Sequence, residues 1–463
     1  MTVTINGTTG LITAGATSSG GGGVASNTAL GGDALQGNTT GTNNTAVGYQ
    51  AGYSATTSGY MTAVGRKAFY ALNNGNLDNF GSTAVGQQAG EAATTGLDNA
   101  FFGGATGSAT TTGSNNTALG CGALRLNTTA SNNTAVGYQA AYSSTTVQEI
   151  TAVGYQALKA STAARTAAFG YIALTANTTG TRNSSFGPYS MATNTTGAFN
   201  SAFGDVALYS NTTGNNNTAV GLSALESNTT GSNNTAVGLE ALKANTTASG
   251  NTAIGYGAAD SLTTGGLNVA VGYLALQAGT GALRNTAVGY LAMENATNQD
   301  NTALGAYSLT SLTSGAGNVG LGDLTGLGLA LFSVTTQSDR LLAGHANITN
   351  AYVRVSWTVT SDARDKTDIQ SVPHGLSFVQ QLKPVSYRWK TSREDDTPKG
   401  NKRYGFLAQD ILALEGNDPV IIDNEQSDHL KYQGESLVPV LVKAIQELKA
   451  EVDSLKAQLN NGA

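Results

Sequence analysis

Small and aliphatic residues alternate with polar ones along most of this chain, in a pattern that returns at a fixed interval. The centre of the pattern is Asn-Thr-Ala-aliphatic-Gly, with clean copies at 44–48, 116–120, 133–137, 217–221, 234–238, 251–255, 285–289 and 301–305. With weaker copies aligned, its glycine stands at 31, 48, 65, 86, 103, 120, 137, 154, 170, 187, 204, 221, 238, 255, 272, 289, 305 and 322. These positions give a 17-residue period, as from Gly221 to Gly238, with one longer interval before Gly86 and two of 16. Such a period indicates a repeat architecture.

Each repeat predicts one coil of stacked β structure. The run Thr-Ala-Val-Gly-Tyr-Gln-Ala-Leu has the period of two that is typical of a strand with one buried face. The run Asn-Thr-Thr-Gly-x-Asn-Asn that follows supplies turn residues, because Gly and Asn accept left-handed backbone conformations. We interpret each unit as strand, turn, short strand, turn. One unit cannot bury its own apolar face, so successive coils must stack, and eighteen coils about 4.8 Å apart make a rod of about 85 Å.

The core of such a rod is thin, because Ala, Val and Gly bury little area and burial contributes only about 25 cal/mol per Å². We therefore expect three chains to pack side by side in a homotrimer. The repeats resemble those in the head regions of trimeric autotransporter adhesins, whose fold is a trimeric left-handed β-roll. The resemblance covers about residues 27–325, although the period is longer than is typical there. The predicted fold is mainly β: a homotrimeric β-solenoid or β-roll shaft, then a small α+β domain that ends in a coiled-coil helix.

Composition divides the chain into four parts. Residues 1–23 precede the repeats and end in four consecutive glycines, which predict a flexible joint. The shaft spans 24–325, and 326–360 is a neck in which 350–360 alternate aromatic and β-branched residues as a strand does. Residues 361–463 hold 13 Lys+Arg and 16 Asp+Glu, which is 29 of the 52 charges in the chain. This last part therefore reads as an ordinary charged domain attached to a nearly uncharged rod.

A helix is predicted over 436–459 from apolar residues at alternating spacings of three and four. These residues are Val438, Leu441, Ile445, Leu448, Val452, Leu455 and Leu459. The spacing is that of the a and d positions of a coiled coil, so the helix is expected to associate with copies of itself. Two alternatives stay open: the a positions do not decide between two and three strands, and an apolar stripe can also pack on its own domain.

Three segments precede this helix in a specific order. They are Ser361-Asp-Ala-Arg-Asp-Lys366-Thr-Asp-Ile, Leu382-Lys-Pro-Val-Ser-Tyr-Arg-Trp-Lys and Tyr404-Gly-Phe-Leu-Ala-Gln-Asp-Ile. Together with the helix, they resemble the C-terminal intramolecular chaperone of phage endosialidases and related tailspikes and fibres, a family of self-cleaving serine peptidases. The resemblance covers about residues 358–463. It implies that Ser361 and Lys366 form the cleavage dyad, and that the bond between Thr360 and Ser361 is cut.

The implied chemistry is reasonable for these residue types. Serine is a weak nucleophile until a base takes its proton, and lysine serves as that base only when its pKa is lowered from about 10.4 by burial or by nearby cations. Arg364 is a candidate for such a cation, whereas Asp362 and Asp365 are expected to cap or pair locally. Single-turnover autoproteolysis is the one enzymatic activity that we expect.

The two resemblances together imply a phage tail fibre subunit that attaches the virion to the host surface. Its expected partners are two further copies of the chain, a phage tail or baseplate protein that holds residues 1–23, and a host-surface glycan or protein receptor. We expect it to assemble in the host cytoplasm and to reside in the virion. The alternative is a tailspike that depolymerises glycans. Against it, the shaft has no inserted globular domain and few acidic residues, whereas glycan hydrolysis usually needs two carboxylates at a defined separation.

Other functional classes find little support in the sequence. A net charge of −6 offers no basic surface for nucleic acid. No signal segment is evident, and the most apolar later window, 319–334, is too short to span a membrane. His345, His374 and His429 are scattered, so no metal and no cofactor are expected. Cys121 is the only cysteine and excludes an intrachain disulfide; we interpret it as a substituted repeat position rather than a reactive thiol.

Overall fold

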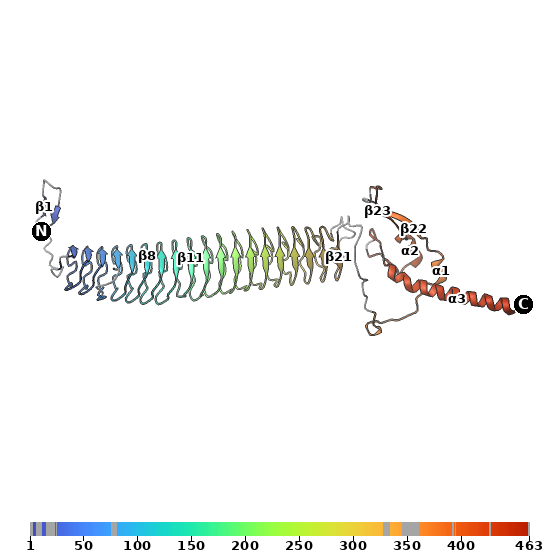
Figure 1. Cartoon of the computed structure of the whole chain (residues 1–463), viewed down its shortest axis with the longest axis horizontal. Coiled ribbons are helices and arrows are strands. Elements are labelled where there is room, and N and C mark those ends of the chain that lie inside the picture. The colour runs from blue at the N-terminus through green and yellow to red at the C-terminus, as the bar shows by residue number, and fades with distance from the viewer. Residues whose placement is uncertain are drawn as a thin grey trace. The chain divides into compact units, whose positions relative to one another are not determined.

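The computed structural model describes residues 3–5, 12–14, 24, 26–75, 81–326, 334–344, 361–390, 393, 395–425 and 427–461. Two compact units make up the chain. The first comprises Met1–Gly326 and Val334–Ala343, and the second comprises Leu327–Ser333 and Gly344–Ala463. Figure 1 shows the ladder of short strands in the first unit and the long helix of the second. The glycines at 20–23 and the predicted neck strand at 350–360 lie outside the described residues.

The first unit begins with a short antiparallel pair, β1 (Val3–Ile5) and β2 (Ile12–Ala14). Nineteen strands of three residues each then follow the repeat. They are β3 (Thr28–Leu30), β4 (Thr45–Val47), β5 (Thr62–Val64), β6 (Thr83–Val85), β7 (Ala100–Phe102), β8 (Thr117–Leu119), β9 (Thr134–Val136), β10 (Thr151–Val153), β11 (Ala167–Phe169), β12 (Ser184–Phe186), β13 (Ser201–Phe203), β14 (Thr218–Val220), β15 (Thr235–Val237), β16 (Thr252–Ile254), β17 (Val269–Val271), β18 (Thr286–Val288), β19 (Thr302–Leu304), β20 (Val319–Leu321) and β21 (Leu341–Ala343).

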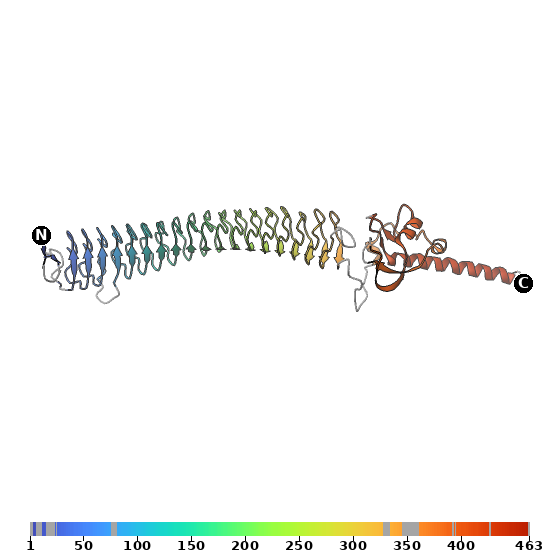
Figure 2. The same cartoon turned by 90° about the horizontal axis from the view of Figure 1, so that it is seen from above.

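Each of these strands pairs in parallel with the next one along the chain, and equivalent residues face each other. Figures 1 and 2 show the resulting stack of coils. A mainly β solenoid with a 17-residue repeat, predicted from the glycine spacing, is thereby confirmed. The irregular intervals do not disturb the ladder, because Thr62 still pairs with Thr83 and Thr151 with Ala167. Insertions and deletions are therefore confined to the turns between strands.

One strand of the ladder was missed by the sequence analysis. β21 pairs in parallel with β20, and Gly344 follows it with a φ of 99°, as the motif glycine does in other coils. Its first residue, Leu341, pairs with Val319 and lies in the segment interpreted as a neck. The interval between these two residues is longer than that between other paired strands of the ladder. The strand could not be predicted because this interval differs from the 17-residue period and the sequence Leu341-Leu-Ala-Gly differs from the Thr-Ala-aliphatic-Gly motif.

The predicted second short strand of each coil is wrong, because the residues that follow the motif glycine form a continuous turn. In the coil of β4, Gly48, Gln50 and Gly52 have φ values of 132°, 56° and 58°. Left-handed residues at every second position cannot form a strand. Hydrogen bonds to both neighbouring coils stabilise them, since the N–H of Gln50 donates to Gly32 O at 2.8 Å and that of Gly52 to Ala68 O at 3.0 Å. The same positions elsewhere hold residues such as Leu225 (φ 53°), for which this backbone is unfavourable without such support.

The motif glycine is required by contact as well as by backbone conformation. A Cβ atom on Gly221, whose φ is 130°, would lie 2.5 Å from the carbonyl oxygen of Gly238 in the next coil. The glycines of successive coils therefore stack backbone on backbone. This explains why the glycine recurs in every copy of the motif.

The shaft core is as thin as the composition predicted. It includes the middle residue of each strand, such as Ala236, and the residues three and four positions after the motif glycine, such as Ala241 and Leu242; these three are fully buried. Phe101 occupies one of these alanine positions in β7. It fits because Gly90 in the preceding coil and Gly107 in its own coil stand where other coils have leucine: a Cβ on Gly107 would lie 2.7 Å from the Phe101 ring.

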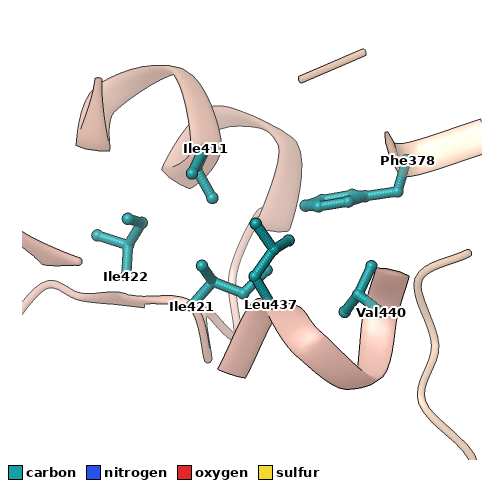
Figure 3. Close-up of a cluster of buried hydrophobic side chains, with 6 residues drawn as sticks. All are labelled: Phe378, Ile411, Ile421, Ile422, Leu437 and Val440. Carbon is teal, nitrogen blue, oxygen red and sulfur yellow. The ribbon is translucent and has the colours of Figure 1, made fainter. Parts of the chain in front are cut away.

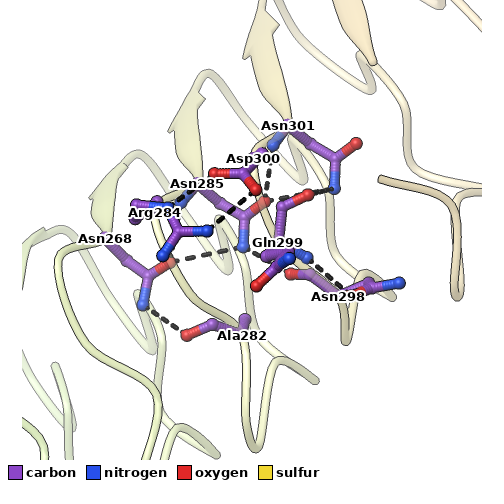
Figure 4. A network of polar contacts seen from close by, with 8 residues as sticks. All are labelled: Asn268, Ala282, Arg284, Asn285, Asn298, Gln299, Asp300 and Asn301. Atoms are coloured by element: carbon purple, nitrogen blue, oxygen red, sulfur yellow. Dashed lines mark hydrogen bonds and ion pairs between the residues drawn. The ribbon is translucent and has the colours of Figure 1, made fainter. Parts of the chain in front are cut away.

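Buried asparagines link the coils on the other side of the core. The Oδ1 of Asn217 accepts the N–H of Asn234 at 3.0 Å, and its Nδ2 donates to Gly231 O at 2.8 Å. Figure 4 shows the same ladder at Asn268, Asn285 and Asn301. A second row joins Asn194, Asn211, Asn228 and Asn245 through amide to amide bonds of 2.7–2.8 Å. That row stops where Leu262 takes the next position, which leaves the buried Oδ1 of Asn245 without a partner among the described residues.

The second unit has irregular structure around one apolar cluster. Its elements are η1 (Ala363–Asp365), α1 (Leu376–Val379), β22 (Val385–Lys390), β23 (Pro398–Gly405), α2 (Ala408–Glu415), β24 (Ile422–Asp423), β25 (Lys431–Tyr432), η2 (Gly434–Ser436) and α3 (Leu437–Asn461). β22 with β23 and β24 with β25 form two antiparallel pairs. Figure 3 shows the buried cluster of Phe378, Ile411, Ile421, Ile422, Leu437 and Val440. The Glu415 carboxylate holds the loop after α2 by accepting three backbone N–H groups, from Val420, Ile421 and Ile422.

Candidate functional site

The first residues of the second unit bring a serine and a lysine together. Asp362 starts the short helix η1, and its Oδ1 accepts the backbone N–H of Arg364 at 2.9 Å. The turn closes when the N–H of Lys366 donates to Ala363 O. As a result the Lys366 Nζ lies 2.7 Å from the Ser361 Oγ. This is the distance of a hydrogen bond between a nucleophile and its base.

Arg364 has a different contact from the one that the sequence suggested. Its guanidinium forms an ion pair with the carboxylate of Asp362, with Nη2 and Oδ2 2.6 Å apart. Hydrogen bonding from Arg364 lowers the pKa of Asp362, and the same contact raises the pKa of Arg364. Asp362 therefore both caps the turn and pairs locally, as expected. Because the charge of Arg364 is matched by Asp362, this arginine is a poor candidate for the cation that would lower the pKa of Lys366.

Ser361, Lys366 and the whole of η1 are exposed in the single chain. The preceding residue, Thr360, lies outside the described residues, so the geometry of the predicted cleavage bond is not described. An exposed lysine is solvated, whereas a general-base lysine needs surroundings that disfavour its charged form. The single chain thus holds the Ser361 hydroxyl and the Lys366 amine in contact but provides no burial around them.

One face of α3 packs on the second unit, and another carries the predicted coiled-coil stripe. Leu437, Val440 and Ala444 are buried in the second unit. Lys443 Nζ donates to Val372 O, and the Glu447 carboxylate accepts the N–H of Leu376, both at 2.6 Å, which ties the helix to the start of α1. None of these residues belongs to the predicted coiled-coil stripe.

The seven stripe residues are all exposed in the single chain. Val438, Leu441, Ile445, Leu448, Val452, Leu455 and Leu459 leave between 36% and 74% of their surface accessible. The alternative left open by the sequence, a stripe packed on its own domain, therefore does not describe the single chain. The packing on the domain comes from a separate set of residues, Leu437, Val440 and Ala444, each one position before a stripe residue.

The shaft carries a second apolar surface, which the sequence analysis did not anticipate. The last residue of each strand, from Leu30 in β3 to Ala343 in β21, is uncharged and apolar. We call this set the outer apolar row, because the middle alanine of the strand faces the core and the last residue does not. Leu30, Phe102, Leu119, Phe203, Val220, Ile254, Leu304 and Leu321 of this row are exposed. The signal was present in the motif, in which the alanine and the aliphatic residue are adjacent and must face opposite sides of a strand.

Aromatic side chains stack along the same surface. Phe169, Phe186 and Phe203 of the outer apolar row have ring centroids 4.7 and 4.9 Å apart. The position after the motif glycine adds a row of tyrosines, in which Tyr138, Tyr155 and Tyr171 stack at 5.3 and 5.1 Å. Cys121 occupies this position in its own coil and is a free, exposed thiol.

Other kinds of site find no support in the described part of the chain. Those residues contain no group of three or more His, Cys, Asp or Glu side chains that could hold a metal ion. Among them, no helix combines the length and the apolar character that crossing a bilayer would require. His374 stacks on Phe378, with ring centroids 4.3 Å apart, and His345 lies outside the described residues.

The comparison with protein families bears on the segment that starts at Ser361. Residues 361–417 match the family model described as chaperone of endosialidase. The second unit carries an endosialidase-type chaperone domain. The match begins at the serine of the Ser361–Lys366 contact and leaves the β-solenoid shaft outside it. No curated protein and no solved structure matches the chain.

Together, the chaperone domain and the solenoid shaft suggest a protein of the tail fibre or tailspike kind. The family also implies that copies of the chain associate with one another.

Proposed function

We propose that this chain is one subunit of a homotrimeric phage tail fibre that attaches the virion to the host surface. Its C-terminal chaperone domain assembles the trimer and then cleaves the chain between Thr360 and Ser361. One observation carries the proposal: the 2.7 Å contact between Lys366 Nζ and Ser361 Oγ occurs at the first residue of the segment that matches the endosialidase chaperone family.

Exposed apolar surface supports association between copies of the chain. Monomeric proteins rarely expose a contiguous apolar patch larger than about 600 Å². Here the outer apolar row continues over all nineteen strands of the ladder, and the coiled-coil stripe continues along α3. Packing three chains against each other along these surfaces removes the surfaces from water. It also adds buried apolar area to the thin core of the single shaft.

A repetitive shaft makes the chaperone necessary. Slipping two chains by one coil leaves nearly every contact between them in place, because most coils are alike. A trimerising domain at one end sets the three chains in register before their non-local contacts form, which is the slow step for such topologies. Removing this domain afterwards makes unfolding effectively one-way, so that the fibre is kinetically stable.

The cleavage reaction follows from the dyad geometry. Lys366, in its neutral form, takes the proton of the Ser361 hydroxyl, and the Oγ attacks the carbonyl carbon of Thr360. The Thr360–Ser361 amide C–N bond then breaks and the Ser361 nitrogen takes up the proton, which leaves an ester between Thr360 and the Oγ. Water hydrolyses this ester to give a carboxylate on Thr360 and a new N-terminus at Ser361. Burial of the exposed dyad between associated chains provides the low-dielectric surroundings that lower the pKa of a lysine.

The remaining parts have complementary roles in this proposal. Residues 1–23 hold a phage tail or baseplate protein, and the shaft presents the surface that contacts a host glycan or protein receptor. The fibre assembles in the host cytoplasm and becomes part of the virion.

The mass of the purified protein tests the proposal. The parent chain is expected to yield a trimer that ends at Thr360 and a released fragment that begins at Ser361, whereas Ser361→Ala yields an uncut trimer. Ser377→Ala, an exposed serine on α1, is the matched control and should be cut as the parent is. A Ser361→Ala protein that still sheds this fragment would refute the dyad, and a monomeric parent with a folded shaft would refute the trimer.

A further inference from the structure

Two coils are one residue shorter than the 17-residue repeat, and each of them has an ion pair at the same corner. We call the residue five positions before the motif glycine the corner residue; it has a left-handed φ, 57° at Arg165 and 54° at Arg284. In the short coil that ends at Gly170, Arg165 Nε lies 2.9 Å from the Oε2 of Glu149, the corner residue one coil earlier. In the short coil that ends at Gly305, Asp300 accepts two bonds from Arg284, at 2.7 and 2.9 Å (Figure 4). Each deletion is thus accompanied by one corner ion pair.

Next to the first short coil lies one more positive charge, which takes no part in the corner ion pair. The corner residue of the following coil is Arg182, whose guanidinium carbon lies 5.2 Å from the ring centroid of Phe199, the next corner residue. At the second short coil, the corresponding corner residue is Gly317. Among the described residues no carboxylate forms an ion pair with Arg182, so the Glu149–Arg165–Arg182 group has a net positive charge.

A recess opens next to this extra cation. Its volume is about 470 Å³, and its lining includes Arg182, the ion pair of Arg165 with Glu149, the hydroxyl residues Thr146 and Thr181, and the amide of Gln148. The recess follows from the deletion, because the turn between Ser161 and Thr166 is one residue shorter than the equivalent turns of its neighbours.

We propose that this recess binds an acidic sugar residue of a surface oligosaccharide. The planar guanidinium of Arg182 matches a carboxylate in a two-bond contact, which is the geometry that distinguishes arginine from lysine in anion recognition. The hydroxyl and amide groups of Thr146, Thr181 and Gln148 are donors and acceptors suited to sugar hydroxyls. Phe199 is a positioning residue that holds the guanidinium plane by stacking.

This inference deepens the proposed attachment function and rests on it for its biological meaning. The recess is open and its charged residues are exposed, so one site binds weakly and loses affinity as salt increases. Several sites on one fibre raise the overall avidity for a polymer without further contacts.

Titration of the full-length protein with oligogalacturonate, followed by saturation-transfer NMR and calorimetry, tests the site. We expect Arg182→Gln to weaken binding by about tenfold or more, because a charged two-bond contact is lost. Arg284→Gln is the matched control, since it removes the corner arginine that pairs with Asp300 of the other short coil, and its binding should equal that of the parent. Uncharged maltooligosaccharide should not bind.

The role of Phe199 is tested separately from folding. Phe199→Leu should weaken binding while the thermal unfolding temperature is retained, and Phe199→Tyr should restore binding because the ring is kept. An Arg182→Gln protein that binds as the parent does, or an Arg284→Gln protein that loses binding equally, overturns the assignment. Inorganic phosphate that competes as strongly as oligogalacturonate overturns the sugar class in favour of a general anion site.

Failure of this inference can be told apart from failure of the proposed function. All the lining residues come from one chain, so a protein that neither trimerises nor cleaves itself is still expected to bind the oligosaccharide. Conversely, a trimer that is cut normally and does not bind refutes the recess alone.

Discussion

The shaft and the C-terminal unit of this chain are stabilised in different ways. In the shaft, each residue contacts its equivalent one coil away, and backbone bonds, buried asparagines and small side chains carry the structure. In the C-terminal unit, Phe378, Ile411 and Val440, which are far apart in sequence, meet in one apolar cluster. The shaft is therefore a sum of nearest-neighbour contacts, whereas the C-terminal unit depends on a single core. In the function proposed above, this difference suits a rod that must persist and a guide that is needed once.

The largest expected effect comes from the glycine stack of the shaft. Gly221→Val puts a side chain at a φ of 130° and against the carbonyl of Gly238, so we expect a loss of more than about 4 kcal/mol, which is exceptional for one substitution. Thermal unfolding followed by circular dichroism measures it. Gly281→Ala is the control, because a Cβ there meets nothing within 4 Å. Equal unfolding temperatures for the two variants would mean that the stacked backbone does not limit shaft stability.

The second largest effect is expected from a substitution in the core of the C-terminal unit. It should not change the stability of a shaft that has already assembled. Ile411→Ala opens a cavity in the cluster and should destabilise this unit by about 2–5 kcal/mol. We expect less trimer and less cleaved product, measured by native mass spectrometry, but an unchanged unfolding temperature for the fibres that do form. Val420→Ala, at an exposed position, is the control. A lower unfolding temperature for those fibres would show that the two regions stay thermodynamically coupled.

A smaller effect is expected in the asparagine ladder. Asn217→Ala leaves the N–H of Asn234 without its partner, at a cost of about 1–3 kcal/mol, and removes one of the two bonds to the carbonyl of Gly231, which still accepts from Asn228 Nδ2. Hydrogen exchange should speed up in the coils on either side of residue 217 and stay unchanged several coils away. Thr213→Ala, at an exposed turn position, provides the comparison. Faster exchange along the entire shaft would contradict the nearest-neighbour description.

The smallest effect concerns the corner ion pairs. The hydrogen bond from Arg284 lowers the pKa of Asp300 below its ordinary value. Because the pKa is lower in the folded chain, this contact contributes above the ordinary pKa of aspartate and is lost as the pH falls through the lowered value. We expect the difference in unfolding temperature between the parent and Arg284→Gln to be small at about pH 6 and to vanish at about pH 2. A difference that persists in acid would assign the stabilisation to packing of the arginine instead.

The features of this protein that could be predicted from the sequence are those that depend on local patterns. The 17-residue period, the parallel stacking and the final helix were all determined by the sequence, because each coil repeats the same short-range pattern and the helix has a regular apolar stripe. The proposed dyad positions, Ser361 and Lys366, come from the family that the ordered segments resemble. Their 2.7 Å contact was not predictable, since it depends on the turn that Asp362 caps.

Only the tertiary structure decided which residues face outward and which contacts close the irregular coils. The outer apolar row depends on the middle residue of each strand facing the core, and the added coil of β21 became visible only through its pairing with β20. Arg364 could be placed against Asp362 rather than Lys366 only from coordinates. The reason is the same in each case: periodicity specifies where a strand or helix lies, but the direction of a side chain and its partner depend on residues brought close by folding.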